Sequence, residues 1–472
     1  MKQDNRSTQL ETDYLIIGSG AAGMAFADTL LTETNSSIVI VDRNDQPGGH
    51  WVFAYPFVKL HQSSAYYGVN SKELSKGIID QVGFNKGLMD LATGQEILAY
   101  YHDLMQYTFL PSGRVKYYPM CEYQGSGCFK SILTGEVFEV KVNKKTVDAT
   151  HLKTKIPATH TPGFDIAPGS CFIPVNDLPR IKTKPAGFVV IGGGKTAIDA
   201  CLWLLEHRID PDLITWIRPR DAWLLDRKNY QLDDDSFEYF LRDQAHQFES
   251  LAVADSIPDL FDRLEKGGCL LRIDKKVTPT MYCCATISRE ELKQLRRIKN
   301  VIRKGRVKRI EENQIVLDKG ILDTTPGHVH VDCSASGLSY PELKPVFDDR
   351  LITIQTVRSC QPAFSSAFIA HIEAAFDDET FKNELCTVIP LPNRDIDWIK
   401  MMSVRMKNQF NWNNNEVVLK WLQESRLEGG FTAKVARIPE DHQRQQELLG
   451  RIRQNIEPAM SKLQLFIRQL HQ

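Results

Sequence analysis

Short apolar runs separated by a helical pattern organise the first part of the chain. Residues 14–17, Tyr-Leu-Ile-Ile, have the length and composition of a buried strand, and residues 38–41 form a second run of this kind. Between them, Met24, Phe26, Leu30 and Leu31 are the apolar positions of a predicted helix. The order strand, helix, strand predicts a βαβ unit with parallel strands.

Three glycines and one acidic residue in this unit indicate a binding site for a dinucleotide. Gly18, Gly20 and Gly23 follow the first strand in the spacing G-x-G-x-x-G, and Asp42 ends the second strand. Such glycines permit a tight turn, close approach of a pyrophosphate and close helix packing, while the acid binds ribose hydroxyls. The N–H groups at the helix start face the phosphates. The predicted dinucleotide contacts are Gly18, Gly20, Ala21, Ala22, Gly23, Asp42 and Arg43.

The same pattern recurs after a linker rich in proline and glycine at 155–185. A strand at 188–191 precedes a G-x-G-x-x-A turn and a helix, and the next strand ends on Arg218. An acid at this place suits a free 2′-hydroxyl, whereas arginine suits a 2′-phosphate. The charges therefore predict FAD in the first unit and NADPH in the second, with a surface charge at Arg218 as the alternative. The predicted contacts are Gly192, Gly194, Lys195, Thr196, Ala197 and Arg218.

The stretch after Asp42 supplies further candidates. Gly49, His50 and Trp51 follow a loop and are predicted to form a second contact with the first cofactor. Residues 52–68 are rich in aromatic side chains around a polar centre that contains His61 and Gln62. This stretch is a candidate wall of the reactive pocket; ordinary core plus a turn is the alternative.

The remaining pattern predicts the other elements. Residues 87–109 have helical periodicity, residues 129–150 alternate as in a β-meander, and 288–291 form a capping box that opens a helix. Small residues at 332–337 after a strand allow the backbone to pass beneath a dinucleotide, with contacts at Ser336 and Gly337. A helix is predicted at 367–376, with its start facing the flavin pyrimidine ring. Residues 398–470 are predicted to be helical, and the apolar stripe from Leu449 to Leu470 is predicted to pack on the body, with a partner site as the alternative.

Composition excludes several classes. With 58 basic and 59 acidic residues, nothing favours nucleic acid or an anionic membrane as a partner. The basic segment 293–309 has no aromatic residue, which favours a solvated face near a phosphate over a nucleic-acid surface. The start of the chain has no secretory signal pattern, and no apolar run approaches the ~20 residues of a membrane span.

Ten cysteines without a C-x-x-C spacing predict reduced thiols in a cytoplasmic protein. Cys283 and Cys284 are interpreted as small buried residues rather than as a redox pair. No metal site is predicted, because the acidic triplet 233–235 is interpreted as a helix start and His328 with His330 has no third ligand in view.

These motifs resemble those of a known superfamily. The segments GSGAAG with Asp42, GGHW and GGGKTA in one chain resemble the two-dinucleotide-binding-domain flavoproteins, and GG-x-W is similar to the flavin-containing and Baeyer–Villiger monooxygenases. DCSASG resembles their "ATG" strand in a diverged form. The resemblance implies an α/β fold with two Rossmann-like domains, in which an FAD domain is interrupted by an NAD(P) domain. The expected parts are 12–165 and 326–397 for FAD, 166–325 for NAD(P) with a helical insertion, and a helical C-terminal region at 398–472.

The resemblance implies a monooxygenase, with one departure. Residues 164–187 lack the F-x-G-x-x-x-H-x-x-x-(F/Y/W) segment of those enzymes. The leading prediction is an FAD-dependent, NADPH-using monooxygenase that acts on a small organic substrate and O2 through a C4a-(hydro)peroxyflavin. The alternatives are an FAD-dependent NAD(P)H reductase without oxygen insertion and a non-catalytic flavin redox sensor. The substrate and the oligomeric state stay open.

Overall fold

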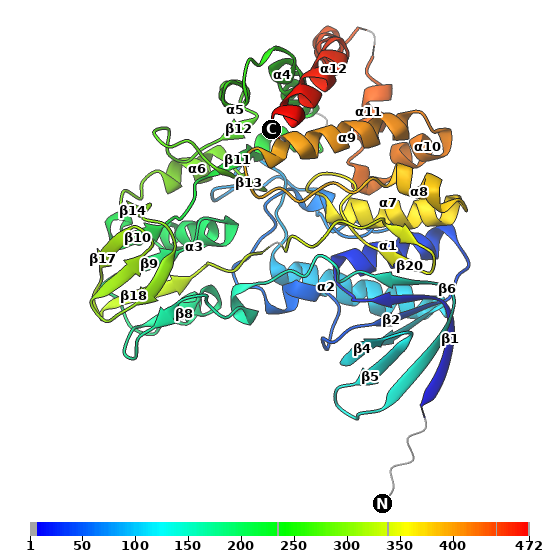
Figure 1. Ribbon diagram of the computed structural model, residues 1–472, viewed down its shortest axis with the longest axis horizontal. Coiled ribbons are helices and arrows are strands. Elements are labelled where there is room, and N and C mark those ends of the chain that lie inside the picture. Colours follow the sequence, from blue (N-terminus) through cyan, green and yellow to red (C-terminus); the bar gives the residue numbers. More distant parts are fainter. Residues whose placement is uncertain (1–6, 234–235, 338, 440, 471–472) are drawn as a thin grey trace, which may run out of the picture.

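A computed structural model describes residues 7–233, 236–337, 339–439 and 441–470. Two sheets, the first mainly parallel and the second wholly parallel, form two lobes, and a layer of helices lies across one side of both (Figure 1). Residues 234 and 235 of the acidic triplet lie outside the described part. Within that part, no helix combines the length and apolarity that crossing a bilayer requires.

The first sheet holds the N-terminal glycine unit. Its strand order is β19-β20-β6-β1-β2-β3, and β1 pairs in parallel with both β2 and β6. Helices cover one face, and a β4–β5 hairpin that pairs with β6 covers the other. The strands are β1 (Thr8–Ile17), β2 (Ile38–Val41), β3 (Val115–Tyr118), β4 (Cys121–Gly125), β5 (Cys128–Ser131), β6 (Val137–Asp148), β19 (Phe347–Asp348) and β20 (Leu351–Thr353). The helices are α1 (Ala21–Glu33), α2 (Gly94–Leu104) and α7 (Pro362–Ala375).

The second sheet repeats this plan. Its order is β14-β10-β9-β18-β8, with parallel pairing throughout. Helices α3 (Lys195–Glu206) and α6 (Arg289–Leu295) pack on one face, and a small four-stranded sheet packs on the other. The strands of the two sheets are β14 (Val301–Ile302), β10 (Ile214–Ile217), β9 (Gly187–Ile191), β18 (His328–Asp332) and β8 (Phe172–Pro174), then β7 (Asp165–Ile166), β15 (Val307–Ile310), β16 (Gln314–Leu317) and β17 (Gly320–Asp323).

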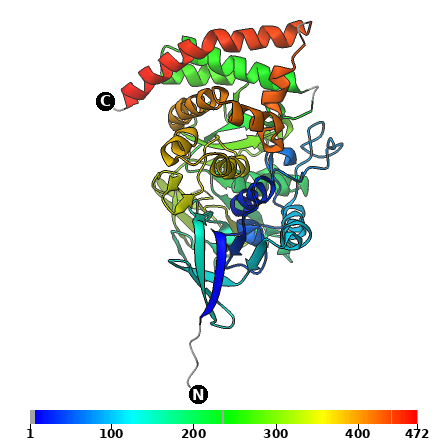
Figure 2. The ribbon, with the colours of Figure 1, turned by 90° about the vertical axis from the view of Figure 1, so that its right-hand side faces the viewer.

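A third layer joins the lobes. It combines the segment between β10 and α6 with the C-terminal helices, and α12 lies along α4 (Figure 2). Phe466 of α12, Met402 of α9 and Tyr282 of β13 share one core. The elements are β11 (Ala222–Asp226), β12 (Leu270–Leu271), β13 (Met281–Ile287), α4 (Phe237–Val253), α5 (Ile257–Lys266), α8 (Glu379–Leu385), α9 (Asp397–Asn413), α10 (Glu416–Glu424), α11 (Phe431–Ala436) and α12 (Gln443–Leu470).

Several expected boundaries change. Strand β18 pairs with β9 and β8, so residues 328–332 belong to the second sheet rather than to a return segment that starts at 326. Strand β7 spans the expected 165/166 boundary, and β1 begins at Thr8, ahead of residue 12. Helix α7 begins at Pro362 rather than at 367, because proline is favoured at a first helical position where no N–H donor is needed.

Candidate functional site

The carboxyl end of β1 leads into a tightly built glycine turn. Gly18 has a φ of +98°, which favours glycine, and a Cβ on Gly23 would lie 1.9 Å from the Gly18 oxygen. A Cβ on Gly49 would lie 2.9 Å from the Cα of Gly20, so the predicted second contact segment does pack on the first. Gly20 is the N-cap of α1 and provides no side-chain cap. An uncapped helix start of this kind suits an anion.

Asp42 fastens this turn to the end of β2. Its carboxylate accepts hydrogen bonds from Ser19 N at 2.6 Å, Ser19 Oγ at 2.8 Å and Asn44 N at 2.8 Å. An ionised carboxylate has about four acceptor positions, so one remains for a ribose hydroxyl. Arg43 beside it is exposed. The predicted ribose contact of Asp42 stays a prediction, and the structure adds a role in holding the turn.

Trp51 anchors the segment that connects the two units. Its side chain is buried, and Nε1 donates to Tyr67 Oη at 2.6 Å, while the neighbouring His50 is exposed. Further along the segment, Tyr55 Oη donates to Asp199 Oδ2 of α3 at 2.7 Å. The stretch from Gly49, which packs on Gly20, to Tyr55 therefore bridges the first glycine unit to the helix of the second.

The second glycine turn is tight at one position and open at another. Gly192 has a φ of +147°, and a Cβ there would lie 2.4 Å from the Cys333 oxygen. At Gly194, the N-cap of α3, a Cβ would have no neighbour within 4 Å, and no side chain caps the helix. Space for a phosphate is therefore present above Gly194. Of the other predicted contacts, Ala197 is buried in the core under the helix, and Thr196 is partly buried.

The two basic side chains predicted to contact the second dinucleotide, Lys195 and Arg218, both form ion pairs within the protein. Lys195 forms an ion pair with Asp199 one helical turn on. Arg218 is 1% exposed, with Nη2 3.0 Å from Asp221 Oδ1 and its guanidinium over the Trp216 ring. Desolvation lowers the pKa of Arg218, and its Nε and Nη1 are buried without a hydrogen-bond partner.

The sequence predicts that Arg218 either contacts a 2′-phosphate or is a surface charge. The buried position, paired with Asp221, matches neither prediction. The reason is local: the chain leaves β10 directly into β11, so Asp221 folds back onto the guanidinium. Arg220 lies closer to the turn, since its backbone oxygen would be 2.7 Å from a Cβ on Gly193. Its side chain is partly exposed and bonds Asn393 Oδ1 at 2.7 Å.

The segment after β18 lies at the second glycine turn. Ser336 and Gly337 are exposed, and the contact of Cys333 with Gly192 places the start of this segment beside that turn rather than the first one. His328 and His330 do share a strand face, because Thr324 Oγ1 contacts a ring nitrogen of each at 3.1 and 3.0 Å. The described part of the chain contains no group of three or more His, Cys, Asp or Glu side chains that suits a metal.

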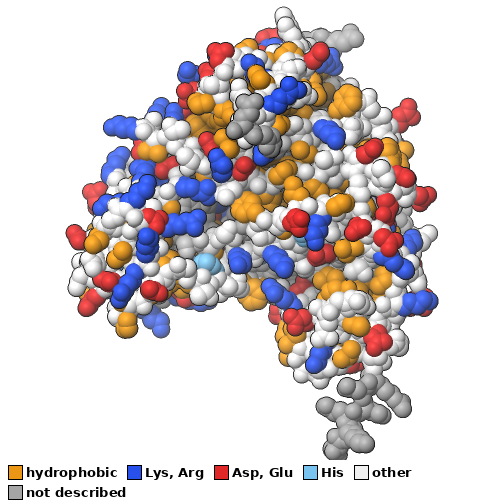
Figure 3. Space-filling model, viewed as in Figure 1, with side chains coloured by type: hydrophobic (Ala, Val, Ile, Leu, Met, Phe, Trp, Pro, Cys, Tyr) orange, Lys and Arg blue, Asp and Glu red, His pale blue; other side chains and the backbone are white. Residues whose placement is uncertain are grey.

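The lobe of the second sheet is rich in surface Lys and Arg (Figure 3). It includes the basic segment 293–309, of which Arg303 turns to Asp221 at 2.9 Å and Arg296 donates to the Ile273 oxygen. Part of this predicted solvated face therefore serves the fold.

The pocket candidate His61 is held as a neutral imidazole. Desolvation, aided by the cations Lys195 and Arg227, lowers its pKa to about 3. Its Nδ1 accepts from Thr286 N at 3.2 Å, which leaves the proton on Nε2, and its backbone oxygen accepts from Arg227 Nε at 2.9 Å. With so low a pKa it is too weak a base for general-base catalysis at neutral pH. His61 can orient a ligand by donating a hydrogen bond.

Two cavities lie on either side of the turn before α7. The outer cavity, of about 150 Å³, is lined mainly by apolar residues. Leu152 follows β6 and Thr356 follows β20, whereas Tyr340 comes from the segment between β18 and β19. This cavity therefore opens at the carboxyl edge of the first sheet, where ligands of such folds bind. The inner cavity, of about 60 Å³, is lined by Gln62, Arg405 and Cys360.

One pair of cysteines departs from the expectation of reduced thiols. Cys284 and Cys360 form a disulfide, whereas the other eight cysteines are free. Cys284 is buried as predicted, yet its partner is 76 residues away rather than the adjacent Cys283. No local spacing in the sequence signals such a pair, and the buried Arg227 and the bridging Tyr55 likewise have no motif around them.

Comparisons with known proteins add the following. The model of an NAD(P)-binding Rossmann-like domain matches residues 16–55. An uncharacterized protein, Rv2000 of Mycobacterium tuberculosis (strain ATCC 25618 / H37Rv), is 49% identical over 418 residues, 89% of this chain and 78% of that protein. A ferredoxin–NADP reductase of Thermus thermophilus is 32% identical over 97 residues, 21% of this chain and 29% of that protein.

Among solved structures, an open crystal structure of cyclohexanone monooxygenase is similar with a TM-score of 0.47 at 13% identity, over 85% of this chain and 97% of that one. Identity of 49% over most of both chains shows common descent with Rv2000, and the two sheets described above show the architecture. The chain belongs to the family of Rv2000, and its described part has two Rossmann-like units and a helical C-terminal region.

Proposed function

We propose that this protein is an FAD-dependent oxidoreductase that uses NADPH. The observation that carries the proposal is the pairing of two glycine turns, each at the carboxyl edge of a parallel sheet and each opening a helix that no side chain caps. The stretch from Gly49 to Tyr55 ties the first turn to the second helix, because Gly49 packs on Gly20 and Tyr55 bonds Asp199. The proposal therefore assigns two bound dinucleotides, and not a single one, to this protein.

The residues present fit FAD in the first unit. The start of α1 suits the pyrophosphate, the remaining acceptor position of Asp42 suits the ribose, and the apolar outer cavity suits part of a flat ring. Bound there, FAD would supply two-electron transfer from NADPH to an acceptor. In the second unit, the open space at Gly194 suits the pyrophosphate, and Arg220 at the turn replaces Arg218 as the candidate for the 2′-phosphate.

The residues of the protein would act by positioning the reacting groups rather than by transferring protons. The neutral His61 can donate a hydrogen bond, and the apolar lining of the outer cavity excludes water from the reacting groups. Such a site suits the leading proposal, a monooxygenase that transfers one atom of O2 to a small organic substrate. An NAD(P)H reductase without oxygen insertion is the second candidate, and the disulfide between the two cavities favours it.

Absorbance of the FAD-loaded protein under argon, before and after NADPH, tests the cofactor assignment. Bleaching of the flavin bands is expected, and a protein that neither binds FAD nor bleaches contradicts it. Product mass under ¹⁸O2 then separates the two reactions, since only the monooxygenase adds a heavy oxygen atom to its substrate.

A further inference from the structure

The disulfide stands at the edge where the first dinucleotide is proposed to bind. Helices α1 and α7 pack together and run in the same direction, because His371 near the end of α7 bonds Glu33 at the end of α1 at 2.7 Å. Both helices therefore begin at the carboxyl edge of the first sheet. Cys360 comes directly before Gln361, the N-cap of α7, and so lies at that edge.

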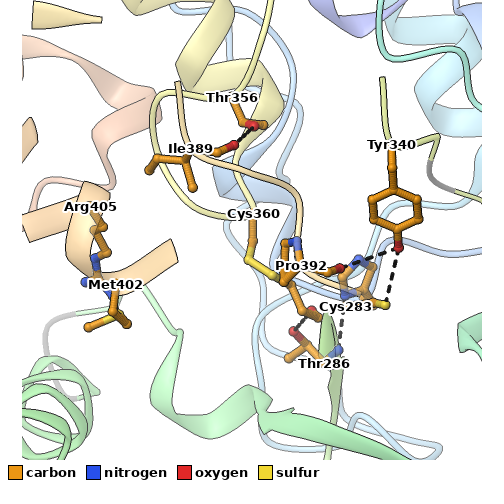
Figure 4. Close-up of a disulfide and its surroundings, with 11 residues drawn as sticks. Cys283, Thr286, Tyr340, Thr356, Cys360, Ile389, Pro392, Met402 and Arg405 are labelled. Carbon is orange, nitrogen blue, oxygen red and sulfur yellow. Dashed lines mark hydrogen bonds between the residues drawn. A yellow bond between two sulfur atoms is a disulfide. The ribbon is translucent and has the colours of Figure 1, made fainter. Parts of the chain in front are cut away.

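The disulfide also lies between the two cavities (Figure 4). On one side, Tyr340 lines the outer cavity, and its hydroxyl is 3.9 Å from the Cys283 sulfur, next to Cys284. On the other side, Cys360 itself lines the inner cavity together with Met402 and Arg405 of α9. The disulfide therefore faces the inner cavity through Cys360 and neighbours the wall of the outer cavity through Cys283 and Tyr340.

The inner cavity is built for a small polar molecule. The residues on either side of Cys360 line it and carry buried polar atoms that have no hydrogen-bond partner, Ser359 Oγ and Gln361 Oε1. Arg405 and Gln62 add further polar groups to the wall. A volume of about 60 Å³ admits a molecule of a few heavy atoms, and unsatisfied buried groups call for a ligand or ordered water. Cys284 and Cys360 also have positive φ values, of +56° and +62°, a conformation that is costly outside glycine.

We propose that Cys284 and Cys360 form a redox-active pair that takes two electrons at the cofactor edge and passes them to a small hydroperoxide in the inner cavity. The proposal rests on the proposed use of FAD and NADPH. In the first half, NADPH gives a hydride and solvent gives a proton, the S–S bond breaks, and two thiols form. In the second half, the O–O bond of the hydroperoxide breaks and the S–S bond forms again. One thiol proton leaves in a water molecule and the other in the alcohol, which is a second water molecule when the oxidant is hydrogen peroxide. The start of α7 favours the thiolate of Cys360.

The first test needs no cofactor. The native full-length protein is reduced with dithiothreitol, alkylated with iodoacetamide and mapped by mass spectrometry. Cys284 and Cys360 are expected to be alkylated after reduction and protected before it, and hydrogen peroxide is expected to restore the protection. Alkylation of this pair only after unfolding would overturn the proposal, as would failure of peroxide to restore the bond.

The second test adds FAD and NADPH under argon, with alkylation as the readout. Two further alkylated cysteines per chain are expected, in step with bleaching of the flavin bands. Bleaching without new thiols overturns the relay and leaves the proposed function intact, whereas absence of bleaching removes both. Cys283→Ser should keep the response, and Cys360→Ser and Cys284→Ser should each abolish it. A response that persists in either of the last two folded variants contradicts the assignment.

Discussion

At the scale of single residues, burial decides what the candidate groups can do. Arg218 shows this, because an arginine at the end of the second βαβ unit suggests a phosphate ligand, yet the side chain is 1% exposed and paired with Asp221. His61 shows it as well, since desolvation turns a candidate base into a neutral hydrogen-bond donor. Residue type and spacing therefore locate a site better than they assign roles within it.

The buried carboxyl of Asp243 should make the free energy of unfolding depend on pH. Desolvation raises the pKa of this buried carboxyl from 3.8 to about 6, despite hydrogen bonds from side chains such as Gln247. The folded state then binds the proton more tightly than the unfolded state, so the free energy of unfolding should fall as pH rises from about 4 to about 6, by up to about 3 kcal/mol. Asp243→Asn should remove this slope in urea unfolding measured across that range. The exposed Asp262→Asn is the control, and equal slopes in both variants would contradict the assignment.

Substitutions at two neighbouring glycines, Gly192 and Gly194, should separate an effect on stability from an effect on NADPH binding. Gly192→Ala should lower the free energy of unfolding by about 1–3 kcal/mol, because its Cβ meets the Cys333 oxygen at 2.4 Å with a positive φ. Gly194→Ala has open space and should change stability by about 1 kcal/mol or less. It should instead weaken NADPH about tenfold or more, a loss of ~1.4 kcal/mol, measured by titration calorimetry. Unchanged NADPH affinity would show that the nucleotide does not approach Gly194.

At the scale of elements, regular patterns predict the structure well and tertiary pairing less well. The glycine turns, α1, α3 and the α6 capping box are confirmed, because each depends on residues adjacent in sequence. The placement of β18 in the second sheet depends on β8 and β9, which are far away in the chain. The Cys284–Cys360 pair and the inner cavity also form from residues that are far apart in the chain, so no local pattern predicts them.

The buried Arg227 should hold the pocket wall at His61 to the three-stranded sheet β12-β11-β13. It lies after β11, pairs with Glu291 of α6 at 2.8 Å and donates to the His61 oxygen. Arg227→Ala leaves Glu291 with a buried unpaired charge and should cost about 3–5 kcal/mol. Arg180→Ala removes an ion pair with Asp177 that is exposed on both sides, and it should cost less than about 1 kcal/mol. Similar losses for both in chemical unfolding would contradict this role.

At the scale of the whole molecule, the C-terminal helices belong to the body. Helix α12 packs on α4 and α9, which confirms the predicted packing for residues such as Leu449 and Leu463. The same stripe leaves Ile456 and Met460 at 38% and 36% exposure, so its middle is less covered than its ends. One core thus links the C-terminal helix to the three-stranded sheet β12-β11-β13.

Adjacent residues of α12 test this link. Phe466 is 1% exposed in the core that contains Tyr282 and Met402, so Phe466→Ala should cost about 3–5 kcal/mol. Leu465 is 47% exposed, and Leu465→Ala should change stability by no more than about 0.5 kcal/mol. Thermal unfolding monitored by circular dichroism distinguishes them. A mild effect at Phe466 would mean that α12 lies loosely on the surface in solution.

The inner cavity takes part of its wall from α9, a helix that belongs to neither sheet. Met401 and Met402 supply that wall with flexible, easily substituted side chains. Substitutions on this one helix would therefore change what the inner cavity accepts without touching the two glycine turns where the nucleotides are proposed to bind.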